Sequence, residues 1–450
     1  MSASKWKPYP EYKDSNVNGL GKIPYHWSVE RIATLGRISK GSGGSKEDNV
    51  DSGLPCIRYG DLYTHHNFVV KDFKTQISAE SASRYTTLEK GDILFAASGE
   101  SIDEIGKSVL FNLDETAYCG GDNIICKTGG TDDSDFLGFA TNAPYFAAQK
   151  SMVGRGFTVL HIYGTQLRDL RLALPPLDER KAISKFISQT KNLLDSQISI
   201  LENLLPLLEE KRLVLITQAV TKGLNPDVSM KDTGLHWYPE VPSHWNLRKV
   251  KHIASIRPSN VDKKKYEGQD KVRLANYVDV YKNDRITEDM DLMVATASEN
   301  EIIKFSLLAG DMIITKDSET WNDIAVPAFV PATMEGVVCG YHLTLIRPNQ
   351  QHVRGEFLFR TYQALGVRDQ YHYNANGVTR YGLGSYWVNN GIVPVPPLHE
   401  QVEIAEYIDR NLQTMKSIED NIQSKIGKLK EYRTALISAA VTGKIDVGSL

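Results

Sequence analysis

The sequence Pro175-Pro176-Leu177-Asp178-Glu179 opens a stretch, 175–223, that returns without a gap as 396–444, 221 residues later. Four of the five opening residues recur in Pro396-Pro397-Leu398-His399-Glu400, where His399 replaces the aspartate. Chance does not produce such agreement over about fifty residues. The chain therefore consists of two similar halves.

Each copy of this stretch predicts one long helix, 178–222 in the first half and 399–443 in the second. Prolines stand just ahead of each helix, where a missing N–H costs nothing, and Gly223 or Gly443 stands near its end. A heptad template started at Ile183 is apolar at seven of eleven positions, and its equivalent from Ile404 at nine of eleven. Such a stripe is typical of a coiled-coil seam, and the natural partner of each helix is the other copy.

The helices should run antiparallel, because the second leaves its half as the first left the first half and must run back. This pairing predicts pseudo-twofold symmetry and places the C-terminus near the N-terminal segment Lys5–Trp27. Pro206 and Gly427 occupy equivalent positions in the two helices, so we expect a kink or local break at both.

The repeat extends beyond the helices. Ile23-Pro24-Tyr25-His26-Trp27 recurs 218 residues later as Val241-Pro242-Ser243-His244-Trp245, so the N-terminus mimics the segment between the halves. An aromatic residue at the same place in both segments favours a packing anchor over a base-stacking platform. Each half then alternates short β-type runs with turns, which indicates mixed α and β structure. The expected strands are 55–59, 91–94 and 123–127 in the first half and 271–274, 310–313 and 343–347 in the second, with late helical patches at 136–150 and 354–369, each followed by a glycine turn, 156–158 or 377–379.

The composition is that of a globular protein rather than a disordered one, with 41% hydrophobic and 24% charged residues in a chain of 450. Four cysteines without a CxxC pair or a His-rich neighbourhood predict reduced, mostly buried thiols and no metal site. No apolar run approaches the roughly 20 residues that span a bilayer, so we expect a cytoplasmic protein without membrane contact.

A net charge of −3 argues against a protein coated in positive charge for non-specific nucleic-acid binding. Any such surface must be local, and one candidate is 246–286, with eleven Lys or Arg against five Asp or Glu. It includes the run Lys263-Lys264-Lys265 beside Tyr266. A solvated loop is the competing interpretation of a lysine run.

Taken together, these features resemble the specificity subunit of type I restriction-modification enzymes. The resemblance rests on Pro-Pro-Leu-x-Glu at the start of each helix, Pro-x-His-Trp in both linkers, Ser98-Gly99-Glu100-Ser101, Ile105-Gly106-Lys107, 429–433 and Val441-Thr442-Gly443-Lys444-Ile445. It covers essentially the whole chain.

The resemblance implies an α+β chain with two similar mixed α/β target recognition domains, each reading one half of a split DNA sequence. Two long antiparallel helices separate them, set the spacer and dock two adenine methyltransferase subunits, and restriction (helicase-nuclease) subunits join for cleavage. S-adenosylmethionine, ATP and Mg are then expected on the partner subunits and no cofactor on this chain. The implied order is an N-terminal segment 1–27, recognition domain 28–174, helix 175–224, linker 225–245, recognition domain 246–395, and helix with C-terminus 396–450.

The residues independently argue against catalysis. The sequence holds no Asn-Pro-Pro-Tyr-like methyltransferase motif, glycine-rich cofactor loop, GxxxxGK[ST] phosphate loop, HExxH pattern or Ser/His/Asp pattern. Glu100 and its counterpart Glu319 lie in different halves, so they do not form a carboxylate pair. Each is a loop residue that either accepts from a cytosine amino group or serves structural hydrogen bonding.

The DNA-binding candidates share a residue type suited to base edges or phosphates and a predicted loop position. In the first half they are Lys40, Lys46, Arg58, Tyr59, His65, Glu100, Arg155 and His161. In the second half they are Arg257, Lys263, Lys264, Lys265, Arg273, Asn276, Tyr277, Lys316, Arg368, His372 and Arg380. For each one, surface charge or structural pairing is the alternative. Two other functions also stay open: a freestanding bipartite DNA-binding protein such as a repressor, and a protein-only adaptor that bridges two partners.

Overall fold

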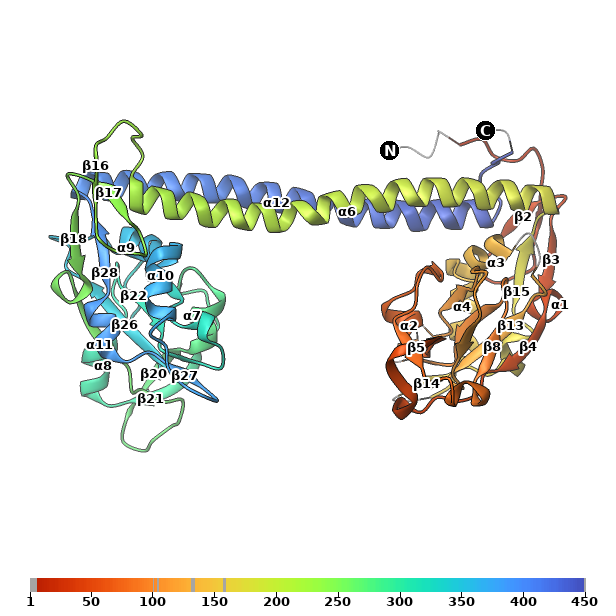
Figure 1. Cartoon of the computed structure of the whole chain (residues 1–450), viewed down its shortest axis with the longest axis horizontal. Coiled ribbons are helices and arrows are strands. Elements are labelled where there is room, and N and C mark those ends of the chain that lie inside the picture. Colours follow the sequence, from red (N-terminus) through yellow and green to blue (C-terminus); the bar gives the residue numbers. More distant parts are fainter. Residues whose placement is uncertain (1–5, 100, 103–104, 131–133, 157–158, 449–450) are drawn as a thin grey trace. The chain divides into compact units, whose positions relative to one another are not determined.

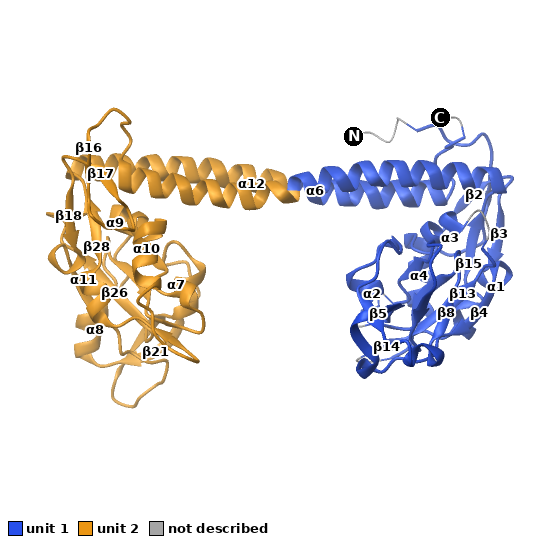
Figure 2. Ribbon diagram, in the orientation of Figure 1, with its two compact units in different colours: residues 1–201, 424–450 blue, residues 202–423 orange. Residues whose placement is uncertain are grey.

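The computed structural model describes residues 6–99, 101–102, 105–130, 134–156 and 159–448. They fall into two compact units: unit 1 comprises 1–201 with 424–450, and unit 2 comprises 202–423 (Figure 2). Two long helices, α6 (Leu177–Lys222) and α12 (Leu398–Val441), contribute a segment to each unit. The helix bounds lie within two residues of those predicted from the sequence.

The remaining elements of unit 1 include short strands and helices. They are β1 (Tyr12–Asp14), β2 (Lys22–Pro24), β3 (Ser28–Arg31), α1 (Ile32–Leu35), β4 (Arg37–Lys40), β5 (Asn49–Ile57), α2 (Tyr59–Thr64), β6 (Phe68–Val69), β7 (Thr75–Ile77), β8 (Thr86–Leu88), β9 (Ile93–Ala96), β10 (Ser98–Gly99), β11 (Ser108–Leu110), β12 (Ala117–Cys119), β13 (Asn123–Lys127), α3 (Ser134–Ala140), α4 (Pro144–Val153), β14 (Leu160–His161), α5 (Gly164–Leu167) and β15 (Arg171–Leu174).

Unit 2, which the structure describes throughout, follows a similar order, but it has no strand in place of β6 or β8 and has an additional α-helix, α8 (Glu299–Phe305). Its elements include β16 (Met230–Asp232), β17 (Glu240–Pro242), β18 (Asn246–Lys249), β19 (Ala254–Pro258), β20 (Asp270–Ala275), α7 (Tyr277–Lys282), β21 (Met293–Ala297), α8 (Glu299–Phe305), β22 (Met312–Thr315), β23 (Asp317–Ser318), β24 (Pro327–Phe329), β25 (Val337–Cys339), β26 (Leu343–Pro348), α9 (Gly355–Gln363), α10 (Leu365–His372), β27 (Tyr381–Gly382), α11 (Ser385–Asn390) and β28 (Ile392–Val395).

The two units share one sheet topology. The larger sheet has the order β4-β13-β9-β11-β6 in unit 1 and β19-β26-β22-β24 in unit 2, and a parallel bridge between Arg285 and Phe329 stands where β6 would continue the second sheet. The smaller sheet pairs β5 with β12 in parallel and β7 antiparallel, as β20 pairs with β25 and β21. Each half is therefore an α+β domain built on the same plan.

The N-terminal segment and the linker fold alike. Strands β1 and β2 form an antiparallel hairpin, and β16 and β17 form its counterpart in unit 2. Trp27 and Trp245 are fully buried, which confirms the packing anchor expected from the sequence. Each indole N–H donates to the glutamate in the first turn of a long helix, Trp27 to Glu179 at 3.0 Å and Trp245 to Glu400 at 2.9 Å.

Within each unit, α6 and α12 lie side by side and run antiparallel, as predicted (Figure 1). In unit 1, Ile183 and Ile187 near the start of α6 share a core with Ala440 and Val441 at the end of α12. In unit 2, the pairing is reversed: the end of α6 shares a core with the start of α12.

The C-terminal residues lie against the N-terminal segment, as expected. Lys444 Nζ donates to the Lys22 carbonyl at 2.6 Å, and the Asp446 amide donates to the Lys7 carbonyl at 2.8 Å. Gly443, at φ +69°, closes α12 where a Cβ would lie 2.2 Å from Pro24 Cδ, so both conformation and space require glycine there.

Of the kink or local break expected at Pro206 and Gly427, the break is wrong. Both residues lie inside uninterrupted helix. A proline removes one main-chain hydrogen bond, and the many remaining bonds and side-chain contacts of a long helix outweigh this loss. The heptad template also fails locally: Leu204, Ile418 and Tyr432 are exposed, whereas Ile198 and Ile426, which are off the template, are buried. A helix of 3.6 residues per turn drifts from a seven-residue repeat.

Other predicted bounds need correction. The patch 136–150 is two helices, α3 and α4, because Pro144 begins a new helix at α4. The patch 354–369 is likewise divided into α9 and α10 at Ala364, which has an extended conformation. The strand expected at 55–59 ends at Ile57, and those expected from Gly91 and Gly310 begin two residues later, because both glycines turn at positive φ.

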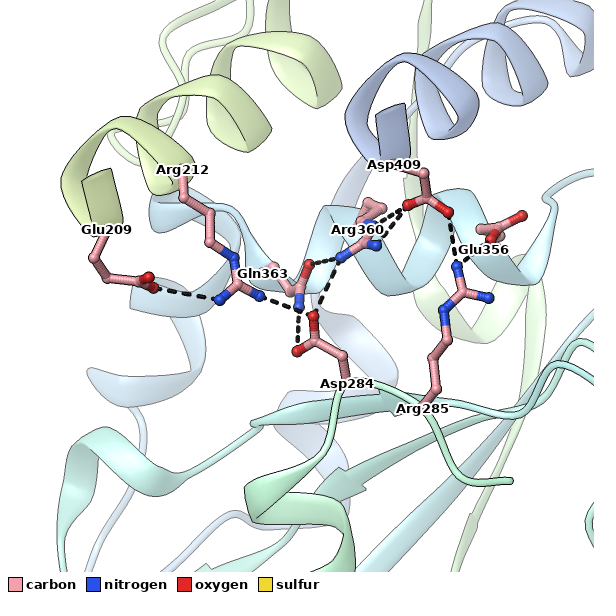
Figure 3. A network of polar contacts seen from close by, with 8 residues as sticks. All are labelled: Glu209, Arg212, Asp284, Arg285, Glu356, Arg360, Gln363 and Asp409. Atoms are coloured by element: carbon pink, nitrogen blue, oxygen red, sulfur yellow. Dashed lines mark hydrogen bonds and ion pairs between the residues drawn. The ribbon is translucent and has the colours of Figure 1, made fainter. Parts of the chain in front are cut away.

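In unit 2 a network of ion pairs holds the domain against the helices (Figure 3). Asp409 of α12 accepts from Arg360 at 2.5 Å and from Arg285 at 2.7 Å, although Arg360 is only 4% exposed. Arg212 of α6 donates to Asp284 at 2.8 Å.

Unit 1 uses the equivalent arginine differently. Arg433, the counterpart of Arg212, forms an ion pair with Asp195 on the other helix. The counterpart of Asp195 is Lys416, which would repel Arg212, so Arg212 pairs instead with Asp284 of the domain. The internal symmetry is thus broken where the domains meet the helices.

Candidate nucleic-acid interface

Each unit has an edge formed by a short pair of antiparallel strands whose two members lie far apart in the sequence. In unit 1, β10 pairs antiparallel with β14, and in unit 2, β23 pairs antiparallel with β27. The carbonyl of Ala97, next to β10, accepts a hydrogen bond from the Ile162 amide, and the Ala97 amide donates to the Asp122 carbonyl, both at 2.9 Å. Lys316 makes the same two contacts with Leu383 and His342, so the edge is equivalent in the two units.

Beside this edge, unit 1 has a hollow with polar walls. Lys40 at the end of β4 and His161 of β14 both line it, so two of the predicted residues come together. The polar lining also includes Ser98, Asp122 and Arg168, and His161 Nδ1 lies 3.0 Å from Ser98 Oγ. The hollow offers a cation, a carboxylate and an imidazole, which suit the donors and acceptors of phosphates and base edges.

A second hollow in unit 2 brings together four predicted residues: Lys263, Lys264, Asn276 and Tyr277. Asn276 is the N-cap of α7, where its backbone N–H donates to Asp279 at 2.8 Å. This capping fixes the start of α7, and with it the position of Tyr277.

Tyr277 and Tyr281 form a stacked pair, with ring centroids 5.7 Å apart and planes 11° apart. The Tyr277 hydroxyl lies 2.9 Å from Ser318 Oγ, and burial raises the pKa of Tyr277. Tyr281 is 42% exposed. Exposed aromatic faces of this kind can stack on unpaired bases, whereas the hydroxyls can bond to phosphates.

Asp317 organises the charged groups at the same edge. Its Oδ2 lies 2.9 Å from His342 Nδ1 and 3.7 Å from Lys316 Nζ. The Lys316 ammonium also lies 5.3 Å from the centre of the Tyr341 ring, which is 47% exposed. His342 adopts φ +70°, a conformation that side-chain-bearing residues rarely take.

Arg58 occupies the N-cap of α2, as Asn276 does that of α7, but its guanidinium is engaged internally. It donates to the Ser45 carbonyl at 2.7 Å and to Asn49 Oδ1 at 2.5 Å. The Arg58 guanidinium also lies over the Tyr85 ring. Tyr85 and Ser81 in turn donate hydrogen bonds to the neighbouring Asp48, which lower the pKa of its carboxyl group. Arg58 therefore orders the loop before β5, and its guanidinium is not free to contact a base.

The remaining predicted residues lie outside the two hollows. Lys46, Tyr59, Arg155, Lys265, Glu319 and Arg380 are exposed. Arg257 and Arg273 donate to the carbonyls of Lys304 and Glu288, respectively. Arg368 is half-buried on α10, and Lys316 belongs to the Asp317 cluster.

Two predicted residues, His372 and His65, differ from an open surface position. His372 is buried and bonds to the Ile324 carbonyl at 3.0 Å, with burial lowering its pKa. His65 is paired with Asp72. Glu100 and residues 157–158 of the first glycine turn lie outside the described residues. In the second turn, Gly377 has φ +159°, and a Cβ there would lie 1.9 Å from the Arg380 carbonyl oxygen.

Sequence reasoning missed Ser98, Asp122, Tyr341 and His342. The internal repeat carried a usable signal, because Asp122 and His342 immediately precede the equivalent strands β13 and β26. Polar residues at the same strand end in both halves indicate a shared site.

Residues 24–205 and 242–428 each match the family model of the type I restriction modification DNA specificity domain. The chain belongs to this family. It is a type I restriction-modification specificity subunit with two DNA-recognition domains, as the sequence predicted.

Relatives extend over nearly the whole specificity subunit. A protein of Methanocaldococcus jannaschii, proposed to be the MjaX type I restriction enzyme specificity subunit, is 23% identical over 97% of this chain and 98% of its own length. The EcoKI specificity subunit of Escherichia coli K12 is 19% identical over 94% and 90%. A chain from a solved type I restriction-modification system superposes with a TM-score of 0.70 at 14% identity, covering 94% of this chain and 99% of its own, which supports the fold. Among the residues that the structure describes, no helix is long and apolar enough to cross a bilayer.

Proposed function

We propose that the two domains of this specificity subunit each read one half of a bipartite duplex target, without carrying out chemistry themselves. The observation that supports this most directly is the duplicated edge: β10 with β14 and β23 with β27 occupy equivalent places in two domains of one topology. Two equivalent edges with different side chains suit two half-sites of different sequence.

We assign two roles to the side chains of these surfaces, phosphate binding and base recognition. Lys263 and Lys264 neutralise phosphates and set register, because an ammonium acts as a compact point charge. Asn276, His161 and the carboxylates of Asp122 and Asp317 have the directional donors and acceptors that distinguish bases in the major groove. Arg155 and Arg380 extend the same surface in the two units, since both are exposed beside the short edge strands.

The long helices are proposed to set the spacer and to bind two methyltransferase subunits. Apolar side chains along them are open to solvent, among them Leu193, Ile200, Leu207 and Ile418, each more than 40% exposed. Several exposed apolar side chains along one pair of helices are typical of a protein–protein interaction surface. Restriction subunits then join for cleavage, and S-adenosylmethionine, ATP and Mg bind to the partner subunits.

Mapping of methylated adenines across the genome, in a host with and without this gene, tests the proposal. We expect one bipartite motif, with two specific halves around a non-specific spacer, to lose methylation on deletion. A second strain tests the domain assignment by exchanging residues 28–174 for the matching domain of a relative with another target. Only one half of the motif should change, whereas an unchanged motif would contradict the assignment.

A further inference from the structure

We propose that His65, His66 and Asp72 of unit 1 form a binding site for a divalent first-row transition cation such as Zn²⁺. Each residue offers one ligand atom, and these three atoms lie within 4.8 Å of one another. The sequence analysis predicted no metal site, because two adjacent histidines and an aspartate six residues later do not form a ligand-spacing motif. The fold between α2 and β7 brings them together.

The geometry positions the ligands from two segments. His65 is the C-cap of α2, with its backbone N–H donating to the Asp61 carbonyl, and the His66 N–H donates to the same oxygen at 2.9 Å. This turn places the two imidazole ring centroids 4.9 Å apart, with the ring planes at 69°. Asp72, beyond β6, contacts His65 Nε2 directly.

His66 is the most buried of the three residues, at 4% relative exposure. Its imidazole packs edge-on against that of His65, and no hydrogen bond from it is seen among the described residues. A neutral imidazole has one ring nitrogen with a free lone pair, which can bind a cation. A cation held between His66, His65 and Asp72 would use that lone pair.

The equivalent place in unit 2 shows that the fold does not require these residues. There α7 is followed by Asn283, Asp284 and Arg285, and the last two bond to the long helices. His65 and His66 thus stand where unit 2 has its ion-pair network, and among the described residues neither is seen to bond to a long helix. The fold therefore does not require histidine at these two positions, and the two side chains can bind a ligand.

The ligand set selects the class of cation. Two imidazoles and one carboxylate suit Zn²⁺ and its neighbours, whereas Mg²⁺ and Ca²⁺ prefer sites made of oxygen atoms. The side chains of His65 and Asp72 are 34% and 71% exposed, so a cation can enter from solvent and keep a water molecule as a further ligand. Bound there, the cation would link the C-terminal end of α2 to the segment before β7. The N-terminal end of the same helix carries Arg58 and Tyr59.

The test uses the full chain, purified without a polyhistidine tag and stripped of metal with a chelator. Co²⁺ is titrated in while its visible absorption is recorded, and Zn²⁺ is then added as competitor. We expect one saturable Co²⁺ per chain, displaced by Zn²⁺, and a rise in the unfolding temperature with Zn²⁺.

Two variants assign the ligands. Asp72→Asn keeps the shape and a hydrogen-bond acceptor but loses the charge, and His66→Gln keeps a polar group in the buried position. Each should weaken Co²⁺ binding by more than the about 10–100-fold that loss of an outer partner costs. His252→Ala, which removes an exposed histidine of unit 2, should leave binding unchanged. Because Asp72 is exposed, its variant is expected to fold even if that of His66 does not.

Absence of saturable binding by the wild-type chain would overturn the site, as would equal affinity in wild type and Asp72→Asn. An absorption band that disappears in His252→Ala would assign the ion to a different histidine and would equally overturn it. None of these results depends on DNA, so they leave the proposed half-site reading untouched.

Discussion

The indole nitrogen of Trp27 lies 3.0 Å from a carboxylate oxygen of Glu179, and the same contact recurs between Trp245 and Glu400. His26 and His244 contact the same two carboxylates at 2.8 and 2.7 Å. The N-terminal segment and the linker thereby hold the first turn of α6 and α12, respectively. This explains why Pro-x-His-Trp and Pro-Pro-Leu-x-Glu recur together.

Removing these carboxylates should destabilise the two units unequally. Glu179 accepts from Tyr9 in addition to His26 and Trp27, whereas Glu400 has the histidine and tryptophan donors. Hydrogen bonds to a charged partner contribute about 1.5–3 kcal/mol each. Glu179→Ala should therefore lower the urea midpoint of unfolding more than Glu400→Ala. Equal shifts, measured by circular dichroism under the same conditions, would contradict this account.

Replacing Lys263, Lys264 and Lys265 together with Ala should weaken DNA binding by the complete complex and flatten its salt dependence. Each lost phosphate contact lowers the slope of log K against log salt by about 0.9. The recognised sequence should stay the same, because lysine chiefly neutralises phosphates. Fluorescence anisotropy over a salt series measures the slope, and the triple Arg variant, which keeps the charge, is the matched control. An unchanged slope in the Ala variant would mean that the run is a solvated loop.

The helices should act as a ruler for the spacer. Seven residues inserted after Leu201 and after Ile422 preserve the heptad register and lengthen each helix by about 10 Å. With bases about 3.4 Å apart, we expect a spacer longer by two or three base pairs around unchanged half-sites. Mapping of methylated adenines in the variant measures the spacer length directly. A folded, active variant that keeps its original spacer, or one with altered half-sites, would refute the ruler.

Lys150 should make the stability of unit 1 depend on pH. Its ammonium is buried, donates to the Gly106 and Thr141 carbonyls at 2.7 and 3.1 Å, and has a pKa lowered by burial to about 7. Between pH 7 and the ordinary pKa of 10.5, the unfolded chain binds this proton and the folded chain does not. The free energy of unfolding therefore rises with pH in that window, by at most about 1.4 kcal/mol per pH unit.

Lys150→Met removes this contribution, so its urea midpoint should change less with pH than that of the wild type. The comparison is best made between about pH 7 and 8, below the ordinary thiol pKa of about 8.5 at which the cysteines of the unfolded chain ionise. Burial raises the pKa of Cys56 and Cys126 to about 12, and both variants share that effect. Parallel pH profiles for Lys150→Met and wild type would show that the ammonium keeps its proton when folded.

From the sequence one can predict the duplication, the bounds of α6 and α12, their antiparallel pairing and the equivalence of the N-terminal segment with the linker. These features depend on periodicity, on terminating residues such as Gly443 and on the direction of the chain, all of which are local or follow from the repeat. The burial of Trp27 and Trp245 followed from the same repeat.

Tertiary structure alone decided where individual side chains are used. Arg212 pairs with Asp284 instead of the other helix, His372 is buried, and Arg58 orders a loop, although each has a residue type suited to DNA. Arg212 and Asp284 are 72 residues apart, so neither one predicts the other. The destination of a polar side chain depends on which segments the fold brings within hydrogen-bonding distance, and residue type and spacing along the chain do not contain that information.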